Sequence, residues 1–326
     1  MKVGIIGLGN MGTAIANNIA SNGNKVMGWD YFQKTANDIN KSHTNTQYLK
    51  GVRLSNNLKA TINITEAVSD KDAVFVALPS IFIRKVLGSC KTNVSRNTII
   101  VNVSKGIEEK TFLTCSMMLK EIFPNNEVLV LSGPSIANEF AHGFPCGVVL
   151  TGGKKETCYK IASLVETETF RTRFSTDSVG VEWSGILKNI YAIGLGIIHG
   201  TGFDSLNFKA VYITRAIEEM ADLIKAIGGD KKSVYYIAGL GDLIATSFSE
   251  HSHNRRLGEL LAKGFSFKDA QEKMGVLPEG LKVLRAAVYL SEKYHVVMPV
   301  ADSLIKVINK EMKPKAFVEH FMKLGV

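Results

Sequence analysis

The spacing of hydrophobic residues changes near the middle of this 326-residue chain. In the first half, short apolar runs alternate with stretches of helical periodicity, which is typical of buried strands joined by amphipathic helices. The runs that predict strands are Lys2–Ile6, Lys25–Trp29, Ala73–Leu78, Thr98–Val103, Val128–Leu131 and Cys146–Leu150. This alternation predicts an α/β fold with a doubly wound parallel sheet.

Long amphipathic patterns replace these runs from about Val179 onward. They predict helices over Val181–Gly196, Phe208–Ile227, Asn254–Lys263, Phe267–Met274, Leu281–Tyr294 and Val300–Asn309. We therefore expect two domains, an α/β domain over residues 1–178 and an all-helical domain over residues 179–326. The chain length agrees with about two domains.

A glycine-rich turn follows the first predicted strand. It reads Gly7-Leu8-Gly9-Asn10-Met11-Gly12 and leads into a helical pattern, a second strand and Asp30. In this context the motif is typical of a Rossmann-type dinucleotide-binding domain. Gly7 would permit the tight turn, Gly9 would let the backbone approach the pyrophosphate, and Gly12 would let helix and strand pack closely. Asn10 and Met11, between these glycines, are therefore cofactor-binding candidates, and the alternative is a glycine turn without a ligand.

Asp30 bears on the choice of dinucleotide. An acid at the end of the second strand can accept hydrogen bonds from the adenosine ribose and repels a 2′-phosphate. We therefore expect NAD to be preferred, with NADP possible because Lys34 is close in sequence. The alternative interpretation is that Asp30 is a solvated turn residue.

Lys188 and Asn189 interrupt the long apolar segment Gly185–Gly196. A buried ammonium group is costly unless it is paired or used, and burial lowers a lysine pKa toward the range of general acid and base catalysis. Lys188 is therefore a catalytic candidate. The alternative is that its stem carries the ammonium group to the surface.

Three further polar segments stand in apolar surroundings. Lys105 follows a predicted strand, where the side chain would point into the crevice that binds ligands in parallel sheets. Ser132–Ala137, also at a strand end, offers small residues and the hydroxyl of Ser135. Asp242, in the segment GLGDL, could support a lysine electrostatically. The alternatives are a solvated loop lysine at Lys105 and a helix N-cap at Asp242.

A basic cluster at Ser252–Arg256 would suit a phosphate group. The alternative is that Arg255 and Arg256 form an ordinary basic helix start. His251 and His253 lie two positions apart with no third ligand in the pattern, so no metal site is expected.

The composition narrows the class of protein. Its formal net charge of +9 comes from scattered lysines and arginines without aromatic interleaving, so no nucleic-acid surface is expected. Its four cysteines lack CxxC spacing and are expected to be reduced thiols of a cytoplasmic protein. Neither a signal peptide nor a membrane span is expected, because a glycine loop follows the first apolar run and charges interrupt the later ones.

Five blocks, in order, resemble the NAD(P)-dependent glycerol-3-phosphate dehydrogenase family of the soluble bacterial type. They are SKGI at Ser104–Ile107, SGPSIANE at Ser132–Glu139, LKNIYAIGLG at Leu187–Gly196, NFKAVYITRAIEEM at Asn207–Met220 and GLGDLIATS at Gly239–Ser247. The resemblance covers nearly the whole chain. It implies reversible reduction of dihydroxyacetone phosphate, a small anionic substrate, to sn-glycerol 3-phosphate for glycerophospholipid synthesis. A homodimer is expected because the apolar helices of the second half could form a dimer face, and the alternative is that they build an ordinary core.

The resemblance also implies residue roles. Lys188 would be the general acid or base at the C2 oxygen. Lys105 would bind substrate and cofactor and stabilise charge on that oxygen, and Asp242 would be its polar partner in the site. The implied substrate-binding positions are Gly133, Ser135, Ser252, His253, Asn254 and Arg255, and the further cofactor-binding positions are Ala137 and Glu279.

Three departures from the family pattern concern this site. His253 stands where the family usually has an arginine, and histidine cannot give the same bidentate phosphate contact. Asn10-Met11 replaces a common Ser-Trp pair, and Gly200–Asn207 carries one extra residue. His253 motivates one alternative, a related dehydrogenase for another small hydroxy compound. A second alternative, of another class, is a dinucleotide-sensing module without turnover. Retention of both Lys105 and Lys188 argues against the sensing module.

Overall fold

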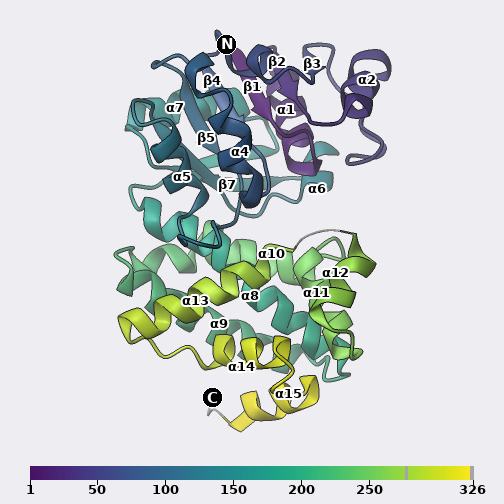
Figure 1. Ribbon diagram of the computed structural model, residues 1–326, viewed down its shortest axis with the longest axis vertical. Helices are drawn as coiled ribbons and strands as arrows, with labels where there is room; N and C mark the ends of the chain where they lie inside the picture. Colours follow the sequence, from purple (N-terminus) through teal and green to yellow (C-terminus); the bar gives the residue numbers. More distant parts are fainter. Residues whose placement is uncertain (276–277, 324–326) are drawn as a thin grey trace. The chain divides into compact units, whose positions relative to one another are not determined.

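The computed structural model describes residues 1–275 and 278–323. The chain divides into two compact units, Met1–Ser178 and Val179–Val326. The first unit contains the sheet and the second is helical (Figure 1). Among the described residues, no helix combines the length and the apolar character that crossing a membrane would require.

The first unit contains, within the described residues, one eight-stranded sheet of order β3-β2-β1-β4-β5-β6-β7-β8. The strands are β1 (Lys2–Ile6), β2 (Lys25–Trp29), β3 (Leu58–Thr61), β4 (Ala73–Val76), β5 (Ile99–Asn102), β6 (Val128–Ser132), β7 (Cys146–Thr151) and β8 (Phe170–Phe174). The predicted α/β class and the doubly wound order around β1 are confirmed. The all-parallel prediction is wrong at β7, which runs antiparallel to β6. Their connection contains only the five-residue helix α6 (Ala137–Ala141), and β7 returns along β6.

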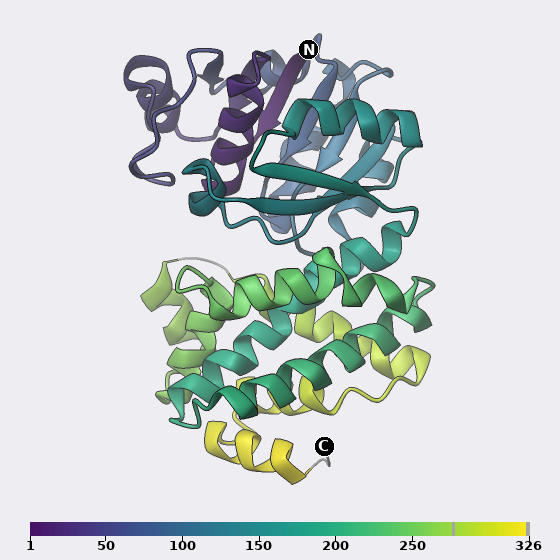
Figure 2. The same ribbon diagram turned by 180° about the vertical axis from the view of Figure 1, so that it is seen from behind.

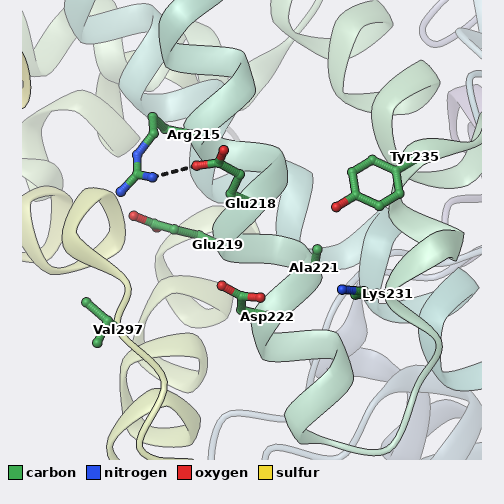
Figure 3. A pocket seen from close by; sticks show the side chains of 8 residues that line it. All are labelled: Arg215, Glu218, Glu219, Ala221, Asp222, Lys231, Tyr235 and Val297. Atoms are coloured by element: carbon green, nitrogen blue, oxygen red, sulfur yellow. Dashed lines mark hydrogen bonds and ion pairs between the residues drawn. The ribbon is translucent and has the colours of Figure 1, made fainter. Parts of the chain in front are cut away.

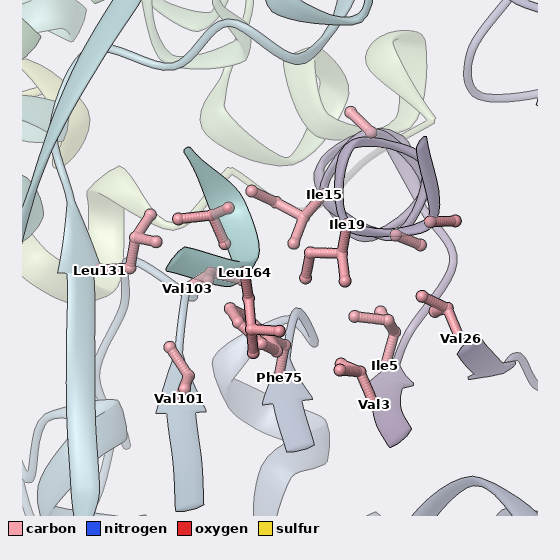
Figure 4. Packing of buried hydrophobic residues seen from close by; sticks show 14 of the residues in the cluster. Val3, Ile5, Ile15, Ile19, Val26, Phe75, Val101, Val103, Leu131 and Leu164 are labelled. Carbon is pink, nitrogen blue, oxygen red and sulfur yellow. The ribbon is translucent and has the colours of Figure 1, made fainter. Parts of the chain in front are cut away.

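Helices cover both faces of this sheet. Val3, Ile5 and Phe75 point to one face and pack with Ile15 and Ile19 of α1 in a single apolar cluster (Figure 4). The alternate strand positions, such as Ile6 and Val76, pack on the other face against α3, α4 and α5. The helices are α1 (Asn10–Ser21), α2 (Gln33–Ser42), α3 (Ile64–Val68), α4 (Ile83–Gly88), α5 (Cys115–Ile122), α6 and α7 (Lys155–Val165).

The second unit is built around α8 (Ser178–Gly200), which is buried from Gly180 to Ile198. A helix that is apolar on all sides is expected to be surrounded by others, and Figures 1 and 2 show α8 among them. They are α9 (Leu206–Ala226), α10 (Asp242–Phe248), α11 (His253–Ala262), α12 (Phe267–Met274), α13 (Gly280–Tyr294), α14 (Pro299–Ile308) and α15 (Pro314–Lys323). The all-helical character predicted for this half is confirmed, and the sequence patterns did not predict α10 and α15.

Glycines let the neighbouring helices approach α8 closely. A Cβ at Gly194 would lie 1.9 Å from the Tyr212 hydroxyl of α9, and a Cβ at Gly196 would lie 2.0 Å from the Arg255 carbonyl oxygen of α11. Larger residues would force the helices apart. The glycines of the GLG segment therefore fix how α8, which carries Lys188, is packed.

Candidate active site

The glycine loop between β1 and α1 has the geometry of a phosphate-binding turn. Gly7 adopts φ +97°, and a Cβ at Gly12 would lie 1.8 Å from the Gly7 carbonyl oxygen, so both positions require glycine. At Gly9 a Cβ would meet no heavy atom within 4 Å. Gly9 is the N-cap of α1 and supplies no side-chain cap to its first turn. The helix N-terminus therefore keeps N–H groups available for an anion.

Asp30 is tied to this loop. Its side chain is buried, and its carboxylate accepts hydrogen bonds from the backbone N–H of Leu8 at 3.0 Å and of Phe32 at 2.9 Å. The alternative of a solvated turn residue is therefore wrong. Burial and the charge of Asp30 raise the pKa of Tyr48, a neighbour that the sequence pattern did not indicate. The carboxylate has further acceptor capacity for a ribose hydroxyl.

Lys105 and the segment after β6 meet at one carbonyl oxygen. Lys105 Nζ donates to the Gly133 oxygen at 2.9 Å, and Ser135 Oγ donates to the same oxygen at 3.1 Å. Gly133 has φ +141°, which only glycine adopts readily. Since β5 and β6 are parallel, their carboxyl ends lie at one edge of the sheet. Lys105 lies in a loop but is half-buried and bonded to Gly133, so its side chain is not fully solvated.

Ala137, the predicted cofactor contact after this segment, is the first residue of α6 and is buried. Asn10 and Met11 lie in the first turn of α1.

Lys188 and Asp242 form a buried ion pair in the helical unit. Lys188 Nζ lies 2.5 Å from Asp242 Oδ1, and the two side chains are 9% and 3% exposed. The lysine does not carry its ammonium group to the surface, and Asp242 does not serve as an N-cap, because Gly241 is the N-cap of α10. Both alternatives are wrong. Removing one member of such a buried pair leaves an uncompensated charge.

Thr246 completes this cluster and was missed by the sequence analysis. Lys188 Nζ also donates to Thr246 Oγ1 at 2.5 Å, and Thr246 Oγ1 donates to Asp242 Oδ1 at 3.4 Å. Thr246 follows Asp242 by one helical turn on α10, so both side chains point to the same side. A hydroxyl one turn after a candidate acid is the signal that could have identified it.

Asn189 and Asn254 are joined directly. Asn254 Nδ2 donates to Asn189 Oδ1 at 2.9 Å, while Asn254 Oδ1 accepts from the backbone N–H of Gly280 at 3.1 Å. Asn254 therefore connects α8, α11 and α13. Ser252, two residues earlier, is the N-cap of α11 and accepts from the backbone N–H of Arg255 at 3.2 Å. Glu279, before α13, pairs with Lys282 at 3.9 Å.

His253 and Arg255 are the two candidate phosphate-binding side chains at the start of α11. Burial, with a smaller contribution from the neighbouring Arg256 and His251, lowers the pKa of His253, which favours the neutral imidazole. Arg255 donates through Nε to Glu259 at 3.0 Å and through a terminal nitrogen to the Phe248 carbonyl oxygen. Two of the guanidinium nitrogens of Arg255 therefore already bond to neighbouring groups of the chain.

Comparison with known proteins identifies the family. A family model described as NAD-dependent glycerol-3-phosphate dehydrogenase N-terminus matches residues 2–158, and the corresponding C-terminus model matches residues 177–319. The chain is 38% identical over 327 residues to a glycerol-3-phosphate dehydrogenase [NAD(P)+] of Bacillus subtilis, covering 99% of this chain and 94% of that protein. Identity to a Clostridium botulinum protein of the same name is 37%, covering 98% and 97%.

A similar solved structure supports the same family. The crystal structure of glycerol-3-phosphate dehydrogenase from Coxiella burnetii superposes with a TM-score of 0.90 at 28% identity, covering 99% of this chain and 98% of that one. These matches extend over both units and include the glycine loop, Lys105, Lys188 and Asp242. The chain belongs to the NAD-dependent glycerol-3-phosphate dehydrogenase family.

Proposed function

We propose that this chain is a glycerol-3-phosphate dehydrogenase that interconverts dihydroxyacetone phosphate and sn-glycerol 3-phosphate with NAD(H) or NADP(H). The observation that carries the proposal is the buried pair of Lys188 on α8 with Asp242 on α10, both within the residues that match the family's C-terminal domain. A buried lysine with an acid partner is a costly arrangement unless it serves chemistry, and here it provides a protonated amine within an apolar helix unit.

The loop between β1 and α1 fits a dinucleotide. The open Cα of Gly9 and the uncapped N-terminus of α1 leave room and N–H donors for a pyrophosphate. Asn10 and Met11, in the first turn, would line this position, and Asp30 would accept the ribose hydroxyls, which favours NAD. Ala137 and Glu279 would be further cofactor contacts. Bound there, the cofactor supplies or accepts the hydride at its nicotinamide ring.

Lys188 would hold and move the proton of the reaction. During reduction it would donate a proton to the alkoxide that develops at C2 of dihydroxyacetone phosphate, and during oxidation it would remove that proton. Asp242 and Thr246 orient its ammonium group through the two 2.5 Å contacts. Lys105 would stabilise the developing negative charge. Gly133 and Ser135 would position the substrate from the segment that Lys105 contacts.

The phosphate of the substrate would be bound more weakly at position 253 than it would be by the arginine that the family usually has there. Ser252, His253, Asn254 and Arg255 are the proposed phosphate contacts, and His253 would donate a hydrogen bond without a charge. The remaining guanidinium N–H groups of Arg255 would contribute the positive charge.

Initial rates with a panel of substrates test the function. NADH and NADPH oxidation would be measured with dihydroxyacetone phosphate, with glyceraldehyde 3-phosphate and with unphosphorylated dihydroxyacetone. We expect turnover with dihydroxyacetone phosphate alone, at a higher kcat/KM with NADH than with NADPH. Absence of turnover with either cofactor at millimolar dihydroxyacetone phosphate would refute the proposal.

We also propose that the enzyme is a cytoplasmic homodimer whose product enters glycerophospholipid synthesis. Light scattering after gel filtration tests the assembly, and a monomer at micromolar concentration would contradict it.

A further inference from the structure

Glu219 is a buried carboxylate that the proposed reaction does not use. It lies on α9 with 3% of its surface exposed. Its Oε1 accepts from the backbone N–H of Val300 at 2.6 Å, and its Oε2 accepts from that of Ala301 at 3.3 Å. Both amides belong to the first turn of α14, whose own N-cap residue, Met298, supplies no side-chain cap. Glu219 therefore caps α14 from a neighbouring helix.

The same carboxylate also reaches α8. Tyr191 is fully buried, and its Oη donates to Glu219 Oε2 at 3.1 Å. A second contact fixes the same residue, because Tyr212 Oη donates to the Tyr191 carbonyl oxygen at 3.2 Å. Gly194 permits the approach of Tyr212, since a side chain there would overlap its hydroxyl. Both the side chain and the main chain of α8 are thus held at Tyr191.

Directional hydrogen bonds, rather than a cation, hold this carboxylate. Glu219 lines a pocket of about 320 Å³ together with Arg215, Glu218 and Asp222 (Figure 3). Arg215 is paired with Glu218 at 2.5 Å, and Glu219 forms no ion pair in the described part of the chain. The three donors, from two helices, orient the carboxyl group more strictly than a single charge contact would.

Lys188 lies one turn before Tyr191 on α8, so the rotation of the helix at Tyr191 also sets the direction of the lysine. We propose that Glu219, acting through Tyr191, is a positioning residue for Lys188: it holds α8 at the rotation at which Nζ reaches both Asp242 and Thr246. The inference rests on the proposed function. A misplacement of about 1 Å can cost roughly a hundredfold in rate, so a modest rotation of α8 is sufficient to matter.

Four variants separate this role from simple stability. Tyr191→Phe removes the hydrogen bond from Tyr191 to Glu219 and leaves the bonds from Val300 and Ala301 to Glu219 in place. Glu219→Gln keeps one side-chain oxygen as an acceptor for α14 and replaces the other, which Tyr191 contacts, with an amide nitrogen. The double variant tests whether the two residues act through one contact. Ser303→Ala is the matched control, because the buried Ser303 hydroxyl bonds the Pro299 carbonyl oxygen within α14 and does not contact Tyr191 or Glu219.

We measure kcat and KM for dihydroxyacetone phosphate, NADH binding by fluorescence, and Tm for each variant. Tyr191→Phe and Glu219→Gln should each lower kcat about tenfold, with KM and the NADH Kd changed less than about twofold, and the double variant should lose no more than either single variant. Ser303→Ala should lower Tm and leave kcat unchanged.

The outcomes distinguish the two proposals. A wild-type enzyme without turnover of dihydroxyacetone phosphate overturns the proposed function. An active wild type whose kcat is unchanged in Tyr191→Phe, or losses that multiply in the double variant, overturn the positioning role alone. The positioning role is also overturned if Ser303→Ala lowers kcat as much as the other variants do, in proportion to the fall in Tm.

Discussion

The ionisation of Glu219 should make the stability of the helical unit depend on pH. Burial raises the pKa of this carboxyl to about 7 from 4.5, against the lowering effect of the hydrogen bonds from Val300, Ala301 and Tyr191. The folded protein therefore binds the proton more tightly than the unfolded chain does. Since a tenfold change in proton affinity is worth about 1.4 kcal/mol, the cost of ionising Glu219 in the fold is roughly 3 kcal/mol.

The sign follows from this difference. Below about pH 4.5 the carboxyl is protonated in both states and the penalty is absent. As the pH rises from about 4.5 to about 7, the unfolded chain ionises first, so the free energy of unfolding falls, and the full penalty is present above pH 7. Glu219→Gln removes this titration while retaining a polar, hydrogen-bonding side chain.

Urea unfolding of wild type and Glu219→Gln, followed by circular dichroism at pH 5 and pH 8, measures the effect. Other groups titrate in both proteins, so only the difference between them is used. Relative to Glu219→Gln, the wild type should lose roughly 2–3 kcal/mol between pH 5 and pH 8. A difference that stays constant with pH, or one that changes in the opposite direction, would refute the reasoning.

Three further predictions concern other parts of the chain. Asp30→Asn should lower the NADH-to-NADPH ratio of kcat/KM about tenfold by removing the charge that repels a 2′-phosphate, and an unchanged ratio would contradict this. Gly258→Ala should destabilise the protein by roughly 1–3 kcal/mol, because its Cβ would lie 1.9 Å from a carbonyl oxygen of α8. Gly88→Ala, where the Cβ meets open space, is the control, and equal Tm values would contradict the prediction. Burial raises the pKa of Cys90 and Cys146 to about 11, so iodoacetamide should label both about a hundredfold more slowly in the native protein than after unfolding, and equal rates would overturn this.

The sequence pattern predicted the elements that are strongly apolar and missed those that are not. Strands β1 and β2 and helix α12 have the predicted bounds. The edge strands β3 and β8 were missed because Lys59, Arg171 and Arg173 break up their apolar character. Half of an edge strand can face water, so its pattern is weak. Helix α10 was missed because it begins within a glycine-rich segment and is short.

Contacts within the candidate site were predictable to different degrees. Lys105 and Gly133 both follow parallel strands, so their meeting at one edge of the sheet follows from topology. Support of a lysine by Asp242 was a hypothesis from chemistry, and the structure identifies that lysine as Lys188. No sequence pattern indicated the contacts of Glu219 with Tyr191 and with α14. Glu219 is separated from Tyr191 by 28 positions and from Val300 by 81 positions, and the packing of three helices brings them together. Only the folded arrangement reveals it.

The central claim is that Lys188 performs the chemistry rather than binding the cofactor, and a parallel measurement of turnover and NADH binding in Lys188→Met tests it most directly. Lys263→Met, at an exposed lysine that ends α11, is the control. The account predicts that Lys188→Met lowers kcat by about a hundredfold to ten-thousandfold while the NADH Kd stays within about twofold of wild type. Turnover comparable to that of Lys263→Met would contradict the account.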